Sequence, residues 1–233
     1  MARKSLAERL VRRFYYKYYA RNLLFELQDR ARRESADYVQ QHMAEAVLYE
    51  TWDRFLQMCV QRAPAGAVLE FGVAGGTSIR QIAAWAKGTV YGFDSFVGLP
   101  DAWSGHVEAE GAFSQRGVLP KVPANVKLYK GWFEETIPLW LSETSDPIGF
   151  LHVDCDIYAS TRSVLLGVRR RLQNGTIIKF DEYFNYPNWQ AHEFRAWQEF
   201  VAEFAVQYRY LAFTASGSAV AVRITDLGSA HSE

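Results

Sequence analysis

The amino-acid sequence predicts an α/β protein with a Rossmann-like, doubly wound sheet. We expect this sheet to be mainly parallel and seven-stranded, with an antiparallel last strand, and to follow N-terminal helices. From residue 67 onward, short β-branched runs alternate with amphipathic helical stretches, which is typical of βαβ units. The first of these runs leads into a glycine-rich turn and a helix. Near the C-terminus a short polar link joins two apolar runs, which favours a hairpin over another crossover helix.

The individual elements follow from the hydrophobic periodicity. Apolar residues recur at three- to five-residue intervals over residues 36–62, which predicts a helix that Pro64 and Gly66 terminate. Strands are expected near residues 68–71, 90–93, 126–129, 150–153 and 176–180. Helices are expected near residues 78–86, 135–141, 161–172 and 190–204. The two strands of the hairpin are expected at residues 208–213 and 219–224.

Length and composition bound the class of protein. The 233 residues are 49% hydrophobic and 22% charged with ordinary Gly and Pro content, which excludes a disordered or collagen-like chain. Lysines and arginines number 26, as do the acids, and this zero net charge argues against a general nucleic-acid binder. Cys59 and Cys155 form neither a disulfide framework nor a metal-ligand spacing. The sequence shows no signal-peptide pattern and no apolar run of ~20 residues, so we expect a cytoplasmic protein without stable membrane insertion.

The charge is unevenly distributed along the chain. The first 33 residues hold ten basic and three acidic residues, which leaves 16 basic and 23 acidic residues in the rest. This segment can be a basic amphipathic helix that touches an anionic membrane or a nucleic acid, or a helical arm that packs on its own domain or on another subunit. Its aromatics occur on several faces, which favours the arm. We expect residues 1–64 to form a helical arm that makes a homo-oligomer, and residues 65–233 to form the main α/β domain.

The glycine-rich turn predicts a ligand site. Gly72, Gly75 and Gly76 let the backbone turn sharply and let a ligand approach main-chain N–H groups. The helix that follows favours an anionic group at its N-terminus, where Thr77 and Ser78 offer hydroxyl groups. The turn does not match the G-x-G-x-x-G pattern, which argues against a dinucleotide.

Two further strand ends add to this site. Asp94 ends the second strand of the βαβ region, where an acid can bind the two hydroxyls of a ribose, although it can also cap a turn. Gly131 and Trp132 follow the third strand and can flank a purine ring, but Trp132 can equally belong to the core.

Three segments together resemble a known family. Glu70-x-Gly72-x-x-Gly75-Gly76-Thr77-Ser78, Asp94-Ser95-Phe96-Val97-Gly98-Leu99-Pro100 and Asp154-x-Asp156-x-Tyr158-x-Ser160-Thr161 resemble the class I S-adenosylmethionine-dependent methyltransferases. Over about residues 65–225 the chain is most similar to macrocin-type O-methyltransferases, which methylate sugar hydroxyls of macrolides. The resemblance implies S-adenosyl-L-methionine as cofactor, with the methionine end on the glycine turn, the ribose on Asp94 and the adenine beside Gly131 and Trp132. The implied cofactor-binding residues are Glu70, Gly72, Gly75, Gly76, Thr77, Ser78, Asp94, Ser95, Gly131, Trp132 and Asp154.

Acids also end the next two strands. Asp154 follows the fourth strand, and Asp181 and Glu182 follow the fifth, so parallel pairing brings the three carboxylates together. Clustered carboxylates repel one another unless a cation neutralises them, and their hard oxygen atoms suit Mg²⁺ or another divalent ion; alternatively they cap helices and turns. The resemblance agrees with a metal at Asp154, Asp181 and Glu182, although Glu182 stands where that family more often has Asp or Asn.

Methyl transfer to a hydroxyl also needs a proton acceptor. The candidates for catalytic residues are Asp154, Asp156 and His192, whereas His152 lies inside a strand and is expected in the core. Residues 97–124 carry many glycines and prolines with little periodicity, which is typical of a lid or of an ordinary decorated loop. In a lid, Trp103 and His106 would face the ligand.

Taken together, the sequence predicts a metal-assisted O-methyltransferase that acts on a hydroxyl of a small molecule, such as a natural-product sugar. One alternative is a related tailoring enzyme, hydroxylase-like or nicotinamide-binding, against which the glycine turn argues. The other is a non-catalytic subunit that keeps the cofactor fold, which would tolerate Asp154→Ala and Asp181→Ala.

Overall fold

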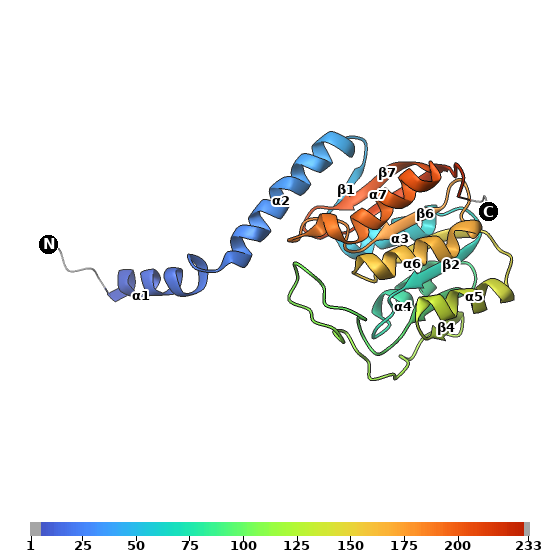
Figure 1. The fold of residues 1–233 in the computed structure, drawn as a ribbon, viewed down its shortest axis with the longest axis horizontal. Helices are drawn as coiled ribbons and strands as arrows, with labels where there is room; N and C mark the ends of the chain where they lie inside the picture. The colour runs from blue at the N-terminus through green and yellow to red at the C-terminus, as the bar shows by residue number, and fades with distance from the viewer. Residues whose placement is uncertain (1–5, 231–233) are drawn as a thin grey trace.

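A single mixed sheet organises the computed structural model, which describes residues 6–230. Its strands lie in the order β1-β7-β8-β6-β5-β2-β3-β4, and β8 runs antiparallel to β6 and β7 while all other neighbours are parallel (Figure 1). The predicted fold class and the C-terminal hairpin are thus confirmed. The strands are β1 (Val47–Tyr49), β2 (Ala67–Phe71), β3 (Val90–Asp94), β4 (Val126–Lys130), β5 (Ile148–Val153), β6 (Ile177–Phe180), β7 (Gln207–Thr214) and β8 (Val220–Asp226).

Helices cover both faces of the sheet. On one face, α5, α6 and α7 pack side by side in front of the strands in Figure 1, and on the other face α3 and α4 pack together. Each face has its own buried apolar cluster, because successive strand residues point to opposite sides, as Phe150 and Leu151 do. The helices are α1 (Leu6–Phe14), α2 (Leu23–His42), α3 (Trp52–Arg62), α4 (Thr77–Trp85), α5 (Phe133–Glu143), α6 (Tyr158–Val168) and α7 (Glu193–Phe204).

The helix predicted over residues 36–62 is wrong. The chain instead ends α2 at His42, forms the short strand β1 and then begins α3. β1 pairs in parallel with β7, with Val47 beside Ala212, and adds an eighth strand at the edge of the sheet. This non-local pairing outweighs the local helical spacing, because three residues gain backbone partners on a strand far away in the sequence.

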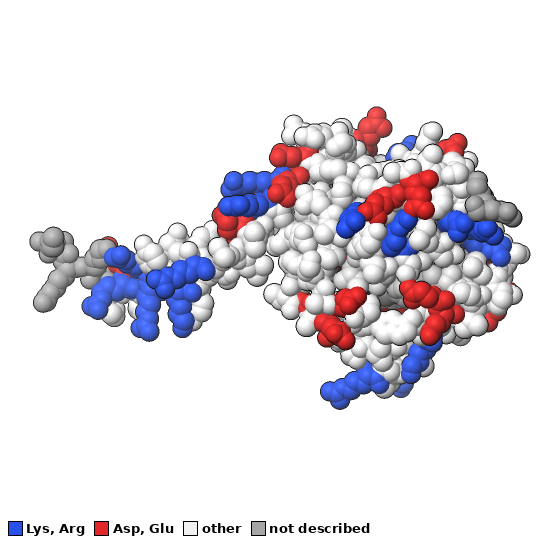
Figure 2. Space-filling model, in the orientation of Figure 1, with Lys and Arg blue, Asp and Glu red and all other residues white. Residues whose placement is uncertain are grey.

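The N-terminal segment projects from the rest of the molecule. α1 has no buried residue, and together with the start of α2 it extends away from the sheet (Figure 1). Further along α2, Ser35 is buried and accepts the backbone N–H of Asn185 at 2.8 Å. The basic side chains of α1 gather along one side of this arm (Figure 2). Among residues 6–230, no helix combines the length and the apolar character needed to cross a membrane.

Candidate active site

A cavity of about 680 Å³ lies at the carboxyl ends of the central strands. In open α/β sheets this is the edge where ligands bind. The far wall comes from the 97–124 segment, including Leu99, Trp103 and Phe113. Ten predicted site residues line the cavity: Gly72, Gly75, Thr77, Ser78, Asp94, Ser95, Trp132, Asp154, Asp156 and Glu182. Five others do not: Glu70, Gly76, Gly131, Asp181 and His192.

The glycine turn is shaped by close backbone approach. Gly72 has a φ of +93°, and a Cβ there would lie 1.7 Å from the carbonyl oxygen of Asp154. The backbone N–H of Asp154 donates to the carbonyl of Phe71 at 2.9 Å, so the ends of β2 and β5 are held together. Gly76 has a φ of +79° and stands at the N-cap of α4, whereas a Cβ at Gly75 would meet no atom within 4 Å. The turn thus aims the N-terminus of α4 at the cavity.

Asp94 fastens this turn to β3. One carboxylate oxygen accepts the backbone N–H groups of Val73 at 2.8 Å and Ala74 at 2.7 Å, and the other accepts that of Phe96 at 2.5 Å. A carboxylate offers about four lone-pair positions, so three accepted bonds leave room for about one more. Asp94 therefore shapes the cavity and retains one acceptor position for a ligand.

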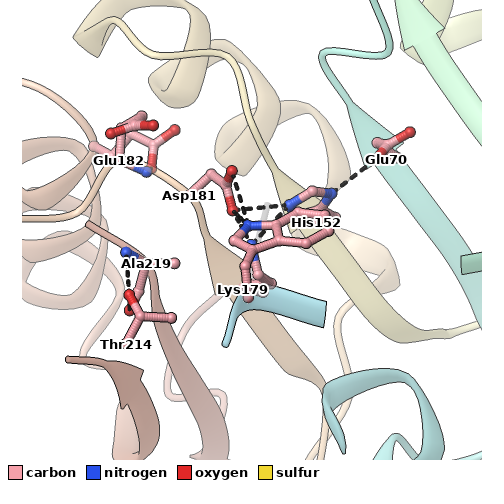
Figure 3. A network of polar contacts seen from close by, with 9 residues as sticks. Glu70, His152, Lys179, Asp181, Glu182, Thr214 and Ala219 are labelled. Atoms are coloured by element: carbon pink, nitrogen blue, oxygen red, sulfur yellow. Dashed lines mark hydrogen bonds and ion pairs between the residues drawn. The ribbon is translucent and has the colours of Figure 1, made fainter. Parts of the chain in front are cut away.

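Below the cavity floor, a buried polar network crosses three strands (Figure 3). Glu70 on β2, His152 on β5 and Lys179 on β6 stand in direct register, and all three side chains are fully buried. His152 Nδ1 lies 2.8 Å from Glu70 Oε1, and Lys179 Nζ lies 3.1 Å from His152 Nε2. Lys179 also forms an ion pair with Asp181, which accepts the indole N–H of Trp52 at 2.8 Å. Glu70 thus contacts His152 and does not line the cavity.

The hydrogen-bond partners of His152 indicate which of its ring nitrogens carries the proton. An ammonium group can only donate, so the lone pair of His152 Nε2 accepts from Lys179 and the proton on Nδ1 is donated to Glu70. Burial lowers the pKa of Lys179 to about 8, while nearby acids, Asp154 first, raise it. The ion pair with Asp181 favours the charged form of this lysine. Lys179 is not among the predicted site residues, although a lysine inside an apolar buried strand is an unusual signal.

The predicted metal ligands are divided between two environments. Ligand atoms of His152, Asp154 and Asp181 lie within 4.8 Å of one another, but Lys179 contacts two of these three residues. A divalent ion placed there would have to displace an ammonium group of like charge, so this arrangement does not fit a resident metal. Glu182 lines the cavity instead, where burial raises its pKa to about 7.

Of the two other candidate catalytic residues, Asp156 lines the cavity together with Asp154, and His192 does not. Asp156 has a φ of +63°, and burial followed by the charges of Asp154 and Glu182 holds its pKa well above the ordinary value. His192 lies outside the cavity lining, where its Nε2 donates to the carbonyl of Ser104 at 2.8 Å. Burial lowers the pKa of His192, although this hydrogen bond opposes the effect.

The 97–124 segment is attached to the chain that follows β6. Asn188 donates to the hydroxyl of Ser104 at 2.6 Å, next to the His192 contact. Trp103 and His106 stack with ring centroids 4.1 Å apart, and both line the cavity. Trp132 also lines the cavity and is 41% exposed, so it is not a core residue.

Comparison with known proteins agrees with this architecture. Residues 69–183 match a family model described as a methyltransferase domain. The calicheamicin methyltransferase CalS11 is 22% identical, with coverage of 95% of this chain and 94% of that chain and a TM-score of 0.58. The O-methyltransferase NovP is 21% identical over 74% of this chain and 79% of that chain, with a TM-score of 0.54. The corresponding values for an O-methyltransferase from Bacillus cereus in complex with SAH are 18%, 94%, 97% and 0.52. No curated protein matches the sequence.

At these identities the solved structures establish the fold, and the family model identifies its central segment. The matched segment contains all the residues that line the cavity, among them the glycine turn, Asp94, Trp132 and Asp154. Residues 69–183 therefore form a methyltransferase domain, and the chain around them has the fold of these O-methyltransferases.

Proposed function

We propose that the chain methylates a hydroxyl group of a small molecule, such as a natural-product sugar. The observation that carries this proposal is the position of Asp154, a carboxylate that lines the cavity directly beside the glycine turn. CalS11, one structure of this fold, is described as a TDP-rhamnose 3'-O-methyltransferase, and it is 21% identical with a TM-score of 0.52 in that comparison. A cavity of about 680 Å³ lies within the usual range for small-molecule sites.

The residues at the cavity fit S-adenosylmethionine. The N-terminus of α4, with Thr77 and Ser78, suits the methionine carboxylate, because unpaired backbone N–H groups favour an anion. The open acceptor position on Asp94 suits one ribose hydroxyl, and Trp132 with Phe133 offers aromatic surface to the adenine. When bound, the cofactor supplies a methyl group that its sulfonium already activates.

The protein then has to orient the acceptor and remove its proton. We assign the proton to the Asp154 carboxylate, which receives it as the new oxygen–methyl bond forms and the sulfur–methyl bond breaks. His192 is less suited, because its ring lies outside the cavity lining. Trp103 and His106 cover the opposite side and exclude water from the acceptor.

Calorimetry with S-adenosylhomocysteine and with NAD tests the cofactor. We expect micromolar binding of the first and none of the second, since the glycine turn lacks the dinucleotide pattern. Binding of NAD alone would favour the nicotinamide alternative. If the Asp154→Ala variant still performs the function of the wild-type chain, the non-catalytic alternative is favoured.

We also propose that the N-terminal arm joins copies of this chain into a homo-oligomer. Five cations of the arm, Arg9, Arg12, Arg13, Lys17 and Arg21, line one hollow, and the chain beyond residue 33 carries seven more acids than bases. The charges are therefore complementary between the arm and the body of another copy. Sedimentation of the full chain with Arg9→Glu, Arg12→Glu and Arg13→Glu combined should show a smaller species than the parent. The single variant Lys87→Glu is the control, and an unchanged oligomer would remove this role of the arm.

A further inference from the structure

We infer that Lys179 is the resident cation of the β5–β6 strand ends, and that this chain holds no divalent metal there. The positive charge that the strand-end acids Asp154 and Asp181 require would then come from a side chain of the sheet itself. The consequence for catalysis rests on the proposed methyl transfer, whereas the consequence for ion binding does not.

The position of the ammonium group carries this inference. Lys179 Nζ is ion-paired with Asp181 and lies 3.1 Å from His152 Nε2. It also lies 4.6 Å from the centroid of the Trp52 ring and 5.6 Å from that of Phe55, on which a cation is favourable. A carboxylate, an imidazole lone pair and two aromatic faces thus surround one fully buried charge.

The remaining donor atoms leave little for a second cation. Asp181 accepts from Lys179 and from the Trp52 indole, and both ring nitrogens of His152 are engaged, one of them by Glu70. Asp154 is then the one member of this cluster that is not held by Lys179. Asp154 offers a single carboxylate, so water or other groups would have to supply the rest of the near-octahedral oxygen shell that Mg²⁺ requires.

Lys179 therefore acts as a positioning residue. Its contacts with Asp181 and His152 link β6 to β5, and His152 passes the link to Glu70, two residues before the glycine turn. Because the ammonium lies outside the cavity lining, it orders the floor of the site and does not contact the acceptor. The acceptor proton then goes to a carboxylate without help from a metal.

Direct titration with Mn²⁺ tests the inference on the wild-type chain. After dialysis against EDTA, we expect no calorimetric binding and no anomalous signal between β5 and β6 in a Mn²⁺-soaked crystal. Mn²⁺ bound by Asp154 together with Asp181 or Glu182 would overturn the inference. Methyl transfer to a hydroxylated acceptor should be equal in EDTA and in Mg²⁺.

Three variants test whether Lys179 itself prevents a divalent metal from binding. Lys179→Met removes the charge at similar volume and exposes the acid cluster, so Mn²⁺ affinity should rise by at least about tenfold. Lys179→Met with Asp181→Asn should lose that gain, and Lys127→Met, which breaks an exposed ion pair with Glu143, should never show it. No gain in Lys179→Met would overturn the inference. If Lys179→Met does not fold, the wild-type crystal decides.

Titration of S-adenosylhomocysteine on the same samples separates the two proposals. Absence of its binding would remove the proposed function and leave the Mn²⁺ result readable. Mn²⁺ binding to wild type with normal S-adenosylhomocysteine binding would remove only the inference about Lys179.

Discussion

The carbonyl oxygen of Asp154 occupies the space that a side chain at Gly72 would need, since a Cβ there would come within 1.7 Å of it. This contact joins the turn that follows β2 to the strand end that carries the proposed proton acceptor. The predicted cofactor site and the predicted catalytic carboxylate are therefore parts of one rigid unit.

Gly72→Ala should disrupt this unit. The new methyl group would clash with backbone and would require a strained φ of +93°, so we expect a loss of about 2 kcal/mol or more in the free energy of unfolding, and loss of S-adenosylhomocysteine binding. Urea denaturation measures the first effect. Gly75→Ala is the matched control, because a Cβ there meets no atom within 4 Å. Equal stability of the two variants would contradict the proposed role of the contact.

Asp94→Ala should weaken cofactor binding through the shape of the turn as well as through a lost contact. It leaves the backbone N–H groups of Val73, Ala74 and Phe96 without their acceptor, at a cost of about 1–3 kcal/mol for a buried group. Calorimetry with S-adenosylhomocysteine should show a loss of at least about tenfold in affinity. Asp101→Ala, at the wall of the same cavity, is the control. An unchanged affinity in Asp94→Ala would show that this carboxylate serves neither purpose.

Asp154→Asn should separate chemistry from binding. The amide keeps the shape of the side chain but accepts a proton poorly, so kcat should fall by about 10²–10⁴ while the affinity for S-adenosylhomocysteine stays within a few fold. His192→Asn, whose ring lies outside the cavity lining, should lower kcat far less. A larger loss in His192→Asn than in Asp154→Asn would reverse the assignment of the proton acceptor.

His192 should make stability depend on pH. Burial lowers its pKa below the ordinary 6.5, so the unfolded chain binds more protons and the free energy of unfolding falls as pH drops below about 6.5. Glutamine can keep the donor to the Ser104 carbonyl without titrating. The stability advantage of wild type over His192→Gln should therefore shrink between pH 7.5 and pH 5 in chemical denaturation. His42→Gln, at the end of α2, is the control, and parallel profiles for wild type and His192→Gln would refute the prediction.

Periodicity predicted most of the sheet, and the rule that parallel strands end together placed the cavity. β1 could not be found in this way, because three residues carry little pattern and their strand state depends on pairing with β7. The strand-end rule brought Asp154, Asp181 and Glu182 to one edge, but it does not say which way each carboxylate points.

The buried network shows the same limit. Lys179 and Asp181 are two residues apart, so a strand places them on one side, and that contact was within reach of the sequence. The register that aligns Glu70, His152 and Lys179 depends on how three strands pair, which no local pattern specifies. The direction of the His192 side chain could not be predicted either, because an irregular segment has no periodicity that fixes where its side chains point.

A crystal structure with S-adenosylhomocysteine tests the central claim most directly. We predict that the ligand occupies the cavity with its carboxylate at the N-terminus of α4, its adenine against Trp132 and its sulfur directed toward the Asp154 carboxylate. An empty cavity at saturating ligand, or a sulfur directed away from Asp154, would contradict the assignment of this cavity as the methyl-transfer site.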